Sequence, residues 1–143
     1  MKIKFFLPTL FAILLFASSC QKQDSSASAT YQVAGLWIGT YTVNNDKTAP
    51  GVYFYSYAVY PDGSILTKGL GADGNYHYSS GNWQLSSTNV FTATITTLIF
   101  NGPPVTQTLT AIYSDKGKMT DGVWKDTNNG VQTGNFSTMQ RVN

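Results

Sequence analysis

The chain of 143 residues has no glutamate, one cysteine and one histidine, and only 11% of its residues are charged. One cysteine cannot form an internal disulfide, and metal sites and acid–base catalysis need clusters of His, Cys, Asp and Glu. A formal charge of +2 is too small for nucleic-acid binding by counterion release or for attachment through a polybasic surface. We therefore expect no metal, no cofactor and no nucleic-acid partner.

The N-terminal region has the parts of a secretory signal peptide. Lys2 and Lys4 form a short basic start, and residues 5–16 are apolar except for Thr9. This run is too short to span a bilayer, which needs about 20 helical residues. Small residues follow it, as they do before a signal-peptide cleavage site. Without Lys2 and Lys4, the remaining cationic and acidic side chains balance at seven each.

Residues 17–20, Ala-Ser-Ser-Cys, end this region and resemble the lipobox of bacterial lipoproteins. The resemblance implies that residues 1–19 are a lipoprotein signal peptide and that a lipid is attached to Cys20. Two or three acyl chains, palmitate among them, would then anchor the protein stably in a membrane. The alternative is an ordinary signal peptide followed by a cysteine placed there by chance.

Residues 20–30 are small and polar after the cysteine, which is typical of a flexible tether. Residues 21–24, Gln-Lys-Gln-Asp, partly resemble the lysine-then-acidic signal by which some Gram-negative bacteria send lipoproteins to the outer face of the outer membrane. Gln23 departs from that pattern, which has an acidic residue there. We expect a lipid-anchored protein of the cell envelope, in the outer membrane, with surface exposure and a periplasmic position both open.

Residues 31–143 are typical of one all-β domain. No window has a helical period, whereas residues 90–97 and 105–113 alternate threonine with larger or more apolar side chains. Clusters of Asp, Asn, Gly and Pro divide the domain at seven regularly spaced points, where they favour turns. The pattern predicts eight strands, near residues 34–43, 52–60, 64–70, 75–85, 90–98, 105–113, 118–125 and 131–141.

Short connections favour antiparallel pairing in sequence order, and an even number of strands lets the first and last strands meet. The prediction is an eight-stranded antiparallel up-and-down barrel, because closure removes exposed sheet edges. An open β-sandwich is the alternative, since turn spacing alone does not separate the two. We expect the domain to be a monomer.

Four predicted strands contain a glycine two residues before an aromatic side chain. In a strand these two positions share a face, so the glycine leaves room for a large ring, and we expect the rings to point inward. The pairs are Gly35 and Trp37, Gly81 and Trp83, Gly122 and Trp124, and Gly134 and Phe136.

The first pair resembles the Gly-x-Trp of the opening strand in lipocalins and related calycins, and Gly39-Thr40-Tyr41 continues it as a strand. In that superfamily an Arg or Lys near the last strand packs across this tryptophan at the barrel base. Arg141 has that position and would make a cation–π contact. The chain is similar to small lipocalin-like lipoproteins, although the loop aspartate motif of lipocalins is not recognisable. We assign four residues to packing at the barrel base: Trp37, Trp124, Phe136 and Arg141.

The inward phase set by these pairs also identifies candidate ligand-binding residues, which are aromatic or neutral and polar. Such a lining suits a small hydrophobic or amphipathic ligand. The same rings could instead fill the barrel, because an eight-stranded barrel can do either. The candidates from this phase are Tyr41, His77, Trp83, Gln107 and Tyr113.

Tyr53, Tyr55 and Tyr57 are further candidates, but both faces of their strand carry rings, so alternation does not assign them. If they point inward, they join the ligand site. If they point outward, they form a tyrosine-rich face with Tyr76 and Tyr78, suited to a glycan or a protein partner. A third reading is that they only pack across strands.

The sequence contains few residues of the types that act in catalysis. His77 has no second His, Cys or Glu to complete a metal site, and no Gly-x-Ser-x-Gly motif is present. Of the seven Asp residues, only Asp121 falls within a predicted strand, and the others fall in the tether or in turns. We expect no catalytic residues and therefore a binding protein rather than an enzyme.

Overall fold

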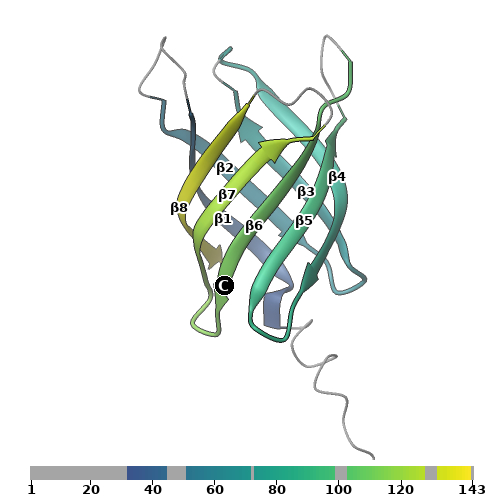
Figure 1. Ribbon diagram of the computed structural model, residues 1–143, viewed down its shortest axis with the longest axis vertical. Helices are drawn as coiled ribbons and strands as arrows, with labels where there is room; N and C mark the ends of the chain where they lie inside the picture. Colours follow the sequence, from purple (N-terminus) through teal and green to yellow (C-terminus); the bar gives the residue numbers. More distant parts are fainter. Residues whose placement is uncertain (1–31, 45–50, 72, 99–102, 128–131, 143) are drawn as a thin grey trace, which may run out of the picture.

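A computed structural model describes residues 32–44, 51–71, 73–98, 103–127 and 132–142 (Figure 1). The predicted signal peptide, Cys20 and the tether lie outside the described residues. Within these ranges, no helix has the length and apolar character needed to cross a membrane. Helix in the described ranges is limited to Gln32 and Val33, which we call the helical turn. The strands are β1 (Gly35–Val43), β2 (Tyr53–Val59), β3 (Ser64–Leu70), β4 (Tyr76–Leu85), β5 (Val90–Thr97), β6 (Thr106–Ser114), β7 (Lys118–Asp126) and β8 (Thr133–Val142).

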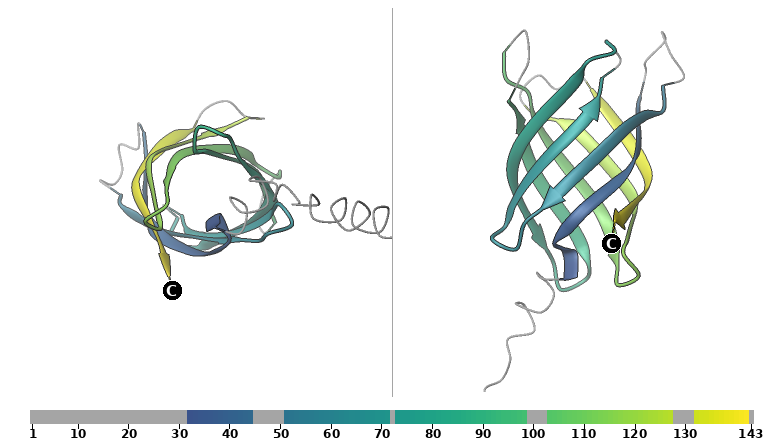
Figure 2. Two further views of the ribbon diagram at one scale, coloured as in Figure 1. Left: turned by 90° about the horizontal axis from the view of Figure 1, so that it is seen from below. Right: turned by 180° about the vertical axis from the view of Figure 1, so that it is seen from behind.

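The eight strands form one closed antiparallel barrel. Each strand pairs with the next in sequence, and β8 pairs with β1 to close the ring, as Figure 2 shows from below. The predicted up-and-down barrel is confirmed, and the sandwich alternative is excluded by the β1–β8 pairing. The strand bounds differ from the predicted ones by only one or two residues.

Alternation explains why these segments form the wall of a barrel. In β5, Phe91, Ala93 and Ile95 are buried, while the threonines between them face outward. This alternation gives β5 an apolar inner face and a more polar outer face. Tight turns join the strands where the backbone needs a left-handed conformation, as at Asn89, whose φ is 61°.

The glycine–aromatic pairs of β7 and β8 fit one another across the two strands. Gly122 lies opposite Phe136, and Gly134 lies opposite Trp124. A Cβ atom at Gly122 would overlap the Phe136 ring, and one at Gly134 would overlap the Trp124 indole and the carbonyl of Thr42. Each ring therefore covers the glycine of the neighbouring strand, which lets both rings lie inside the barrel.

The two ends of the barrel differ in their connections. We call the end that holds the helical turn and the short connections 60–63, 86–89 and 115–117 the turn end, which is at the bottom of Figure 1. The other end, at the top, is where β1, β3, β5 and β7 end and where β2, β4, β6 and β8 begin, and we call it the loop end. Odd-numbered strands run toward the loop end, and even-numbered strands return from it.

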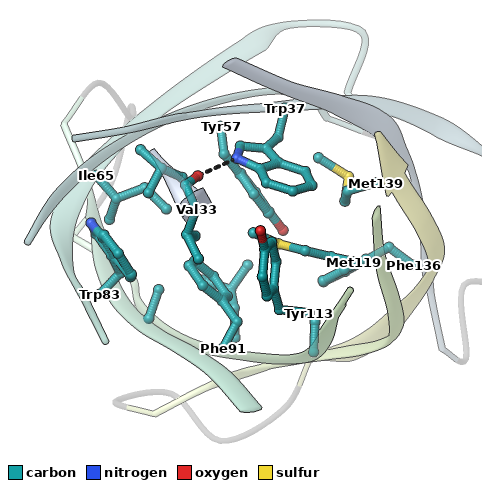
Figure 3. Packing of buried hydrophobic residues seen from close by; sticks show 14 of the residues in the cluster. Val33, Trp37, Tyr57, Ile65, Trp83, Phe91, Tyr113, Met119, Phe136 and Met139 are labelled. Atoms are coloured by element: carbon teal, nitrogen blue, oxygen red, sulfur yellow. Dashed lines mark hydrogen bonds between the residues drawn. The ribbon is translucent and has the colours of Figure 1, made fainter. Parts of the chain in front are cut away.

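The interior from the turn end to the middle of the barrel is filled by large side chains, and every strand contributes at least one (Figure 3). This packing makes the core of the domain. Its principal residues are Val33, Trp37, Tyr57, Ile65, Trp83, Phe91, Tyr113, Met119, Phe136 and Met139.

The N-terminal segment closes the turn end from inside the ring of strands (Figure 2, left). Val33 is fully buried, and its carbonyl accepts a hydrogen bond of 2.8 Å from the Trp37 indole. The carbonyl of Gln32 accepts two more, from the Tyr113 hydroxyl at 3.2 Å and from the Arg141 guanidinium at 2.5 Å. Three strands thus hold this segment in place.

Candidate functional site

The direction of each strand decides which predicted residues meet at the loop end. Residues late in odd-numbered strands and early in even-numbered strands lie there. This rule brings together most of the predicted ligand-binding residues and adds Trp124, which lies late in β7. The residues at the loop end are Tyr41, Tyr53, Tyr55, His77, Gln107 and Trp124.

Four aromatic rings, Tyr41, Tyr53, Tyr55 and Trp124, form what we call the loop-end cluster. Ring centroids lie 5.4 Å apart for Tyr41 and Tyr53, 5.2 Å for Tyr41 and Tyr55, and 5.9 Å for Tyr41 and Trp124. Tyr55 and Trp124 are buried, whereas Tyr41 and Tyr53 are half-buried. The cluster therefore has a buried floor and a partly exposed upper layer.

Hydrogen bonds to the main chain orient this cluster. The Tyr41 hydroxyl donates to the carbonyl of Leu70 at 2.9 Å, and the Trp124 indole donates to the carbonyl of Thr42 at 3.2 Å. Burial, with smaller contributions from nearby Tyr53 and Asp73, raises the pKa of Tyr41 to about 12. The phenol of Tyr41 is therefore neutral at physiological pH.

The tyrosines of β2 point into the barrel. Tyr53 is half-buried, Tyr55 is 8% exposed and Tyr57 is fully buried, so exposure falls along the strand from the loop end. We call these three residues the tyrosine ladder. Phe54, on the other face of β2, is 41% exposed. A tyrosine-rich outer face therefore cannot include Tyr55 or Tyr57.

A glycine of β3 leaves room for Tyr55 on the inner face. Gly69 is a direct cross-strand neighbour of Tyr55, and a Cβ atom at Gly69 would lie 3.1 Å from the Tyr55 ring. Gly39 of β1 is the neighbour on the other side, but the space inside Gly39 is taken by Met139. Gly69 was a signal in the sequence that alternation alone did not use.

A polar rim surrounds the loop end. Asp73 accepts hydrogen bonds from the main chain and side chain of Asn75, at 3.0 and 3.1 Å, and its carboxylate lies 3.0 Å from the His77 ring. The hydrogen bonds from Asn75 and His77 lower the pKa of Asp73 to about 2. On the opposite wall, the Gln107 amide donates to Asp126 at 2.9 Å. These contacts hold neutral and acidic groups around the rings.

The described residues contain no group of three or more His, Cys, Asp and Glu side chains that could hold a metal ion. Asp121 lies in β7, which does not pair with the strand of His77, and it faces solvent at a bulge where its φ is 54°. The two residues that the sequence offered for catalysis are therefore not brought together.

Two predicted ligand-binding residues, Trp83 and Tyr113, lie at the turn end instead. The Trp83 indole donates to the carbonyl of Tyr60 at 2.8 Å, and its ring stacks on Phe91 with centroids 5.8 Å apart. The Tyr113 ring meets Trp37 edge-on, with centroids 6.1 Å apart. Both residues belong to the packed core, which separates them from the loop-end cluster.

The four residues predicted at the barrel base are also divided. Trp37 and Arg141 lie at the turn end, but Trp124 lies at the loop end and Phe136 lies between, against Tyr57. The reason is strand direction, because Trp124 comes late in β7 and Phe136 comes early in β8.

The expected cation–π contact of Arg141 with Trp37 is absent from the described part of the chain. The two residues are cross-strand neighbours, but the Arg141 guanidinium turns to the carbonyl of Gln32. The cation–π contacts in this part of the chain are instead made by Lys68, whose Nζ lies 4.1 Å from the Tyr76 ring centroid and 5.6 Å from that of Tyr78.

Comparison with known proteins gives a likeness of fold. No protein-family model and no curated protein matches the chain. A solved structure of EF1p2_mFAP2b bound to DFHBI is similar, with a TM-score of 0.61 and 16% sequence identity. The similarity covers 82% of this chain and 99% of that chain. The two proteins therefore share the barrel architecture.

Proposed function

We propose that this protein is a lipid-anchored protein of the cell envelope whose barrel binds a small hydrophobic or amphipathic molecule at the loop end. The observation that carries the proposal is the loop-end cluster, where half-buried rings lie over a buried aromatic floor. Aromatic walls with a few oriented polar groups are typical of small-molecule sites, because the rings supply affinity and the polar groups supply orientation.

The charges near the cluster favour an uncharged or weakly polar ligand. The described lysines and Arg141 are on the outer face or at the turn end, and the rim acids Asp73 and Asp126 are hydrogen-bonded to neighbouring side chains. No cation therefore faces the loop-end cluster among the described residues, and an anionic ligand would lose hydration without gaining a partner.

The structural neighbour supports the same proposal. EF1p2_mFAP2b has a similar fold and is bound to DFHBI. An eight-stranded barrel is just wide enough to hold one small ligand when its interior is not completely filled by side chains. In this chain the half-buried inner rings, Tyr41 and Tyr53, lie at the loop end, so the loop end is where a ligand would find inner aromatic surface that other side chains do not fully cover.

Tryptophan fluorescence tests the proposed site, because the tryptophans lie at different ends. We expect 2-acetylnaphthalene, a neutral aromatic ketone, titrated into the full chain in detergent, to quench the emission of Trp124. The quenching should persist in Trp83→Phe, a matched control at the turn end, and should be lost in Trp124→Phe. Quenching that disappears in Trp83→Phe would place the ligand elsewhere. If neither DFHBI nor a neutral naphthalene binds, and native mass spectrometry finds no co-purified molecule, the barrel is not a ligand-binding module.

The anchor is proposed from the sequence, on the basic start, the short apolar run and the lipobox-like residues before Cys20. In a bacterial host, the wild-type chain should incorporate labelled palmitate, and Cys20→Ser should not. Ser25→Ala in the tether is the matched control and should remain labelled. Label that persists in Cys20→Ser would contradict the lipoprotein assignment, and protease treatment of intact cells would separate surface exposure from a periplasmic position.

A further inference from the structure

The lowest residue of the tyrosine ladder, Tyr57, has an unusual hydroxyl. Tyr57 is fully buried, and no described atom meets the geometry of a hydrogen bond with its hydroxyl oxygen, although the Tyr55 phenol lies close enough to interact with it electrostatically. Buried polar groups in folded proteins nearly always have a partner, and one without a partner destabilises the fold. The other buried tyrosine at this depth, Tyr113, has a partner in the carbonyl of Gln32.

The Tyr57 ring points toward the barrel axis and packs against Tyr55 of the loop-end cluster. Figure 3 shows the Tyr57 ring directed from the wall to the middle of the barrel. Its ring meets Tyr55 edge-on, with centroids 4.7 Å apart, and Phe136 with centroids 6.0 Å apart. Tyr57 belongs to the packed core, and Tyr55 separates it from the loop end. A ligand at the loop-end cluster therefore has to displace the Tyr55 ring to reach the Tyr57 hydroxyl.

The inner wall beside Tyr57 is polar but uncharged. Thr67, Ser79 and Thr97 continue its row across β3, β4 and β5 as successive cross-strand neighbours. Thr67 and Ser79 are buried. Burial, reinforced by the neighbouring Tyr55, raises the pKa of Tyr57 well above its usual value. The phenol therefore keeps its proton and is available as a hydrogen-bond donor.

We propose that Tyr57 donates a hydrogen bond to the ligand and selects neutral, flat, largely apolar molecules that carry an oxygen acceptor, such as an aromatic ketone. The inference rests on the proposed function and names the ligand class of the same site. The ligand supplies the acceptor that the fold itself does not provide. Tyr57 is thus a specificity residue whose hydroxyl weakens the empty barrel and strengthens the complex.

Two probes of similar shape test this assignment. 2-Acetylnaphthalene has a carbonyl acceptor, and 2-ethylnaphthalene does not. Calorimetry with the full chain in detergent should show that the ketone binds roughly five- to tenfold more tightly, the ratio that one neutral hydrogen bond gives. Tyr57→Phe should bind both probes equally. Tyr113→Phe is the matched control, and it should keep the preference for the ketone.

Thermal unfolding without ligand supplies a second, independent readout. Tyr57→Phe removes an unpartnered hydroxyl and should leave Tm unchanged or raise it, whereas Tyr113→Phe breaks a hydrogen bond and should lower Tm. A Tm in Tyr57→Phe that falls as far as in Tyr113→Phe shows that the fold already satisfies the Tyr57 hydroxyl, and this overturns the inference.

The binding results separate the inference from the proposed function. If wild type prefers the ketone and Tyr57→Phe keeps that preference, another residue is the donor, and the inference is wrong while the ligand-binding function stands. If wild type binds both probes equally, the Tyr57 hydroxyl does not donate to the ligand. The inference is then wrong, and the ligand-binding function still stands. If wild type binds neither probe nor DFHBI, the proposed function itself is contradicted.

Discussion

The two ends of the barrel contain the same aromatic residue types, but these residues contact different parts of the chain. At the turn end, Trp37 and Tyr113 bond to the N-terminal segment, which lies inside the ring and closes it. At the loop end, Tyr41 and Trp124 bond to the carbonyls of Leu70 and Thr42, which belong to the barrel wall. No described segment closes the loop end in the way that the N-terminal segment closes the turn end. The exposure of a tyrosine or tryptophan near a barrel end therefore depends on whether another segment covers that end.

This difference separates stability from binding along the barrel axis. The turn end and the middle are filled by fully buried side chains such as Trp37, Phe91 and Met119, whose packing stabilises the fold. The half-buried rings and the hydrogen-bonded acids gather at the loop end. Substitutions at the turn end should then mainly lower the free energy of unfolding, whereas substitutions at the loop end should lower it less and mainly affect binding.

The largest expected effect is at the turn end. Trp37→Ala removes a fully buried ring and its hydrogen bond to Val33, and should lower the free energy of unfolding by about 3–5 kcal/mol. Tyr53→Ala, the matched truncation at the loop end, should cost about 1 kcal/mol or less because Tyr53 is half-buried. Urea unfolding measures both. Equal losses would mean that the two ends do not differ in packing.

The next effect concerns the closure of the turn end. Arg141→Met removes the hydrogen bond to Gln32 and should lower the free energy of unfolding by about 1 kcal/mol, because this contact is partly exposed to solvent. Lys118→Met removes an exposed cation at the same end and should change stability by less than about 0.5 kcal/mol. Thermal unfolding compares the two variants. If Arg141→Met matches Lys118→Met, the contact does not stabilise the closed end.

Another effect is expected at the loop end in alkaline solution. The pKa of Tyr41 is about 12 in the fold, against about 10 in an unfolded chain. The folded state holds this proton more tightly, so the stability it contributes is complete below pH 10 and is lost as the pH rises through 12. Tyr41→Phe should therefore show a shallower fall of unfolding free energy between pH 10 and 12. A slope equal to that of wild type would contradict the burial of this phenol.

The smallest effect is expected in acid. The pKa of Asp73 is about 2, below its usual value, because Asn75 and His77 stabilise the carboxylate. Its contribution to stability is present above about pH 4 and is lost as the pH falls through 2. Asp73→Asn should lose less Tm than wild type between pH 4 and 2, and Asn75→Ala, which removes one donor, should behave in the same direction. The difference should be small because Asp73 is exposed.

The strands and their order could be predicted from local patterns. Threonine alternating with apolar residues in β5 and β6, and the Asn, Asp, Gly and Pro clusters between strands, act over a few residues each. Seven short connections then permit little except pairing in sequence order. The sequence alone therefore determined the eight strands, to within one or two residues, and their order, whereas the β1–β8 pairing of the structure decided between a closed barrel and an open β-sandwich.

The candidate site was predicted only in part. Tyr41, His77 and Gln107 were assigned to the interior by alternation, and the structure brings them to one end. Trp124 was assigned to the opposite end because its Gly-x-Trp motif matched that of Trp37. A motif of three residues carries no information on how far along a strand it lies or in which direction that strand runs.

Only the tertiary structure decided the orientation of the tyrosine ladder and the partners of its hydroxyls. The Tyr55 ring lies on the inner face beside Gly69 of another strand, where a larger side chain would crowd it. Tyr113 has a hydrogen-bond partner and Tyr57 has none among the described residues, although both lie on the inner face. These properties depend on contacts between residues far apart in sequence, and such contacts exist only when the barrel closes.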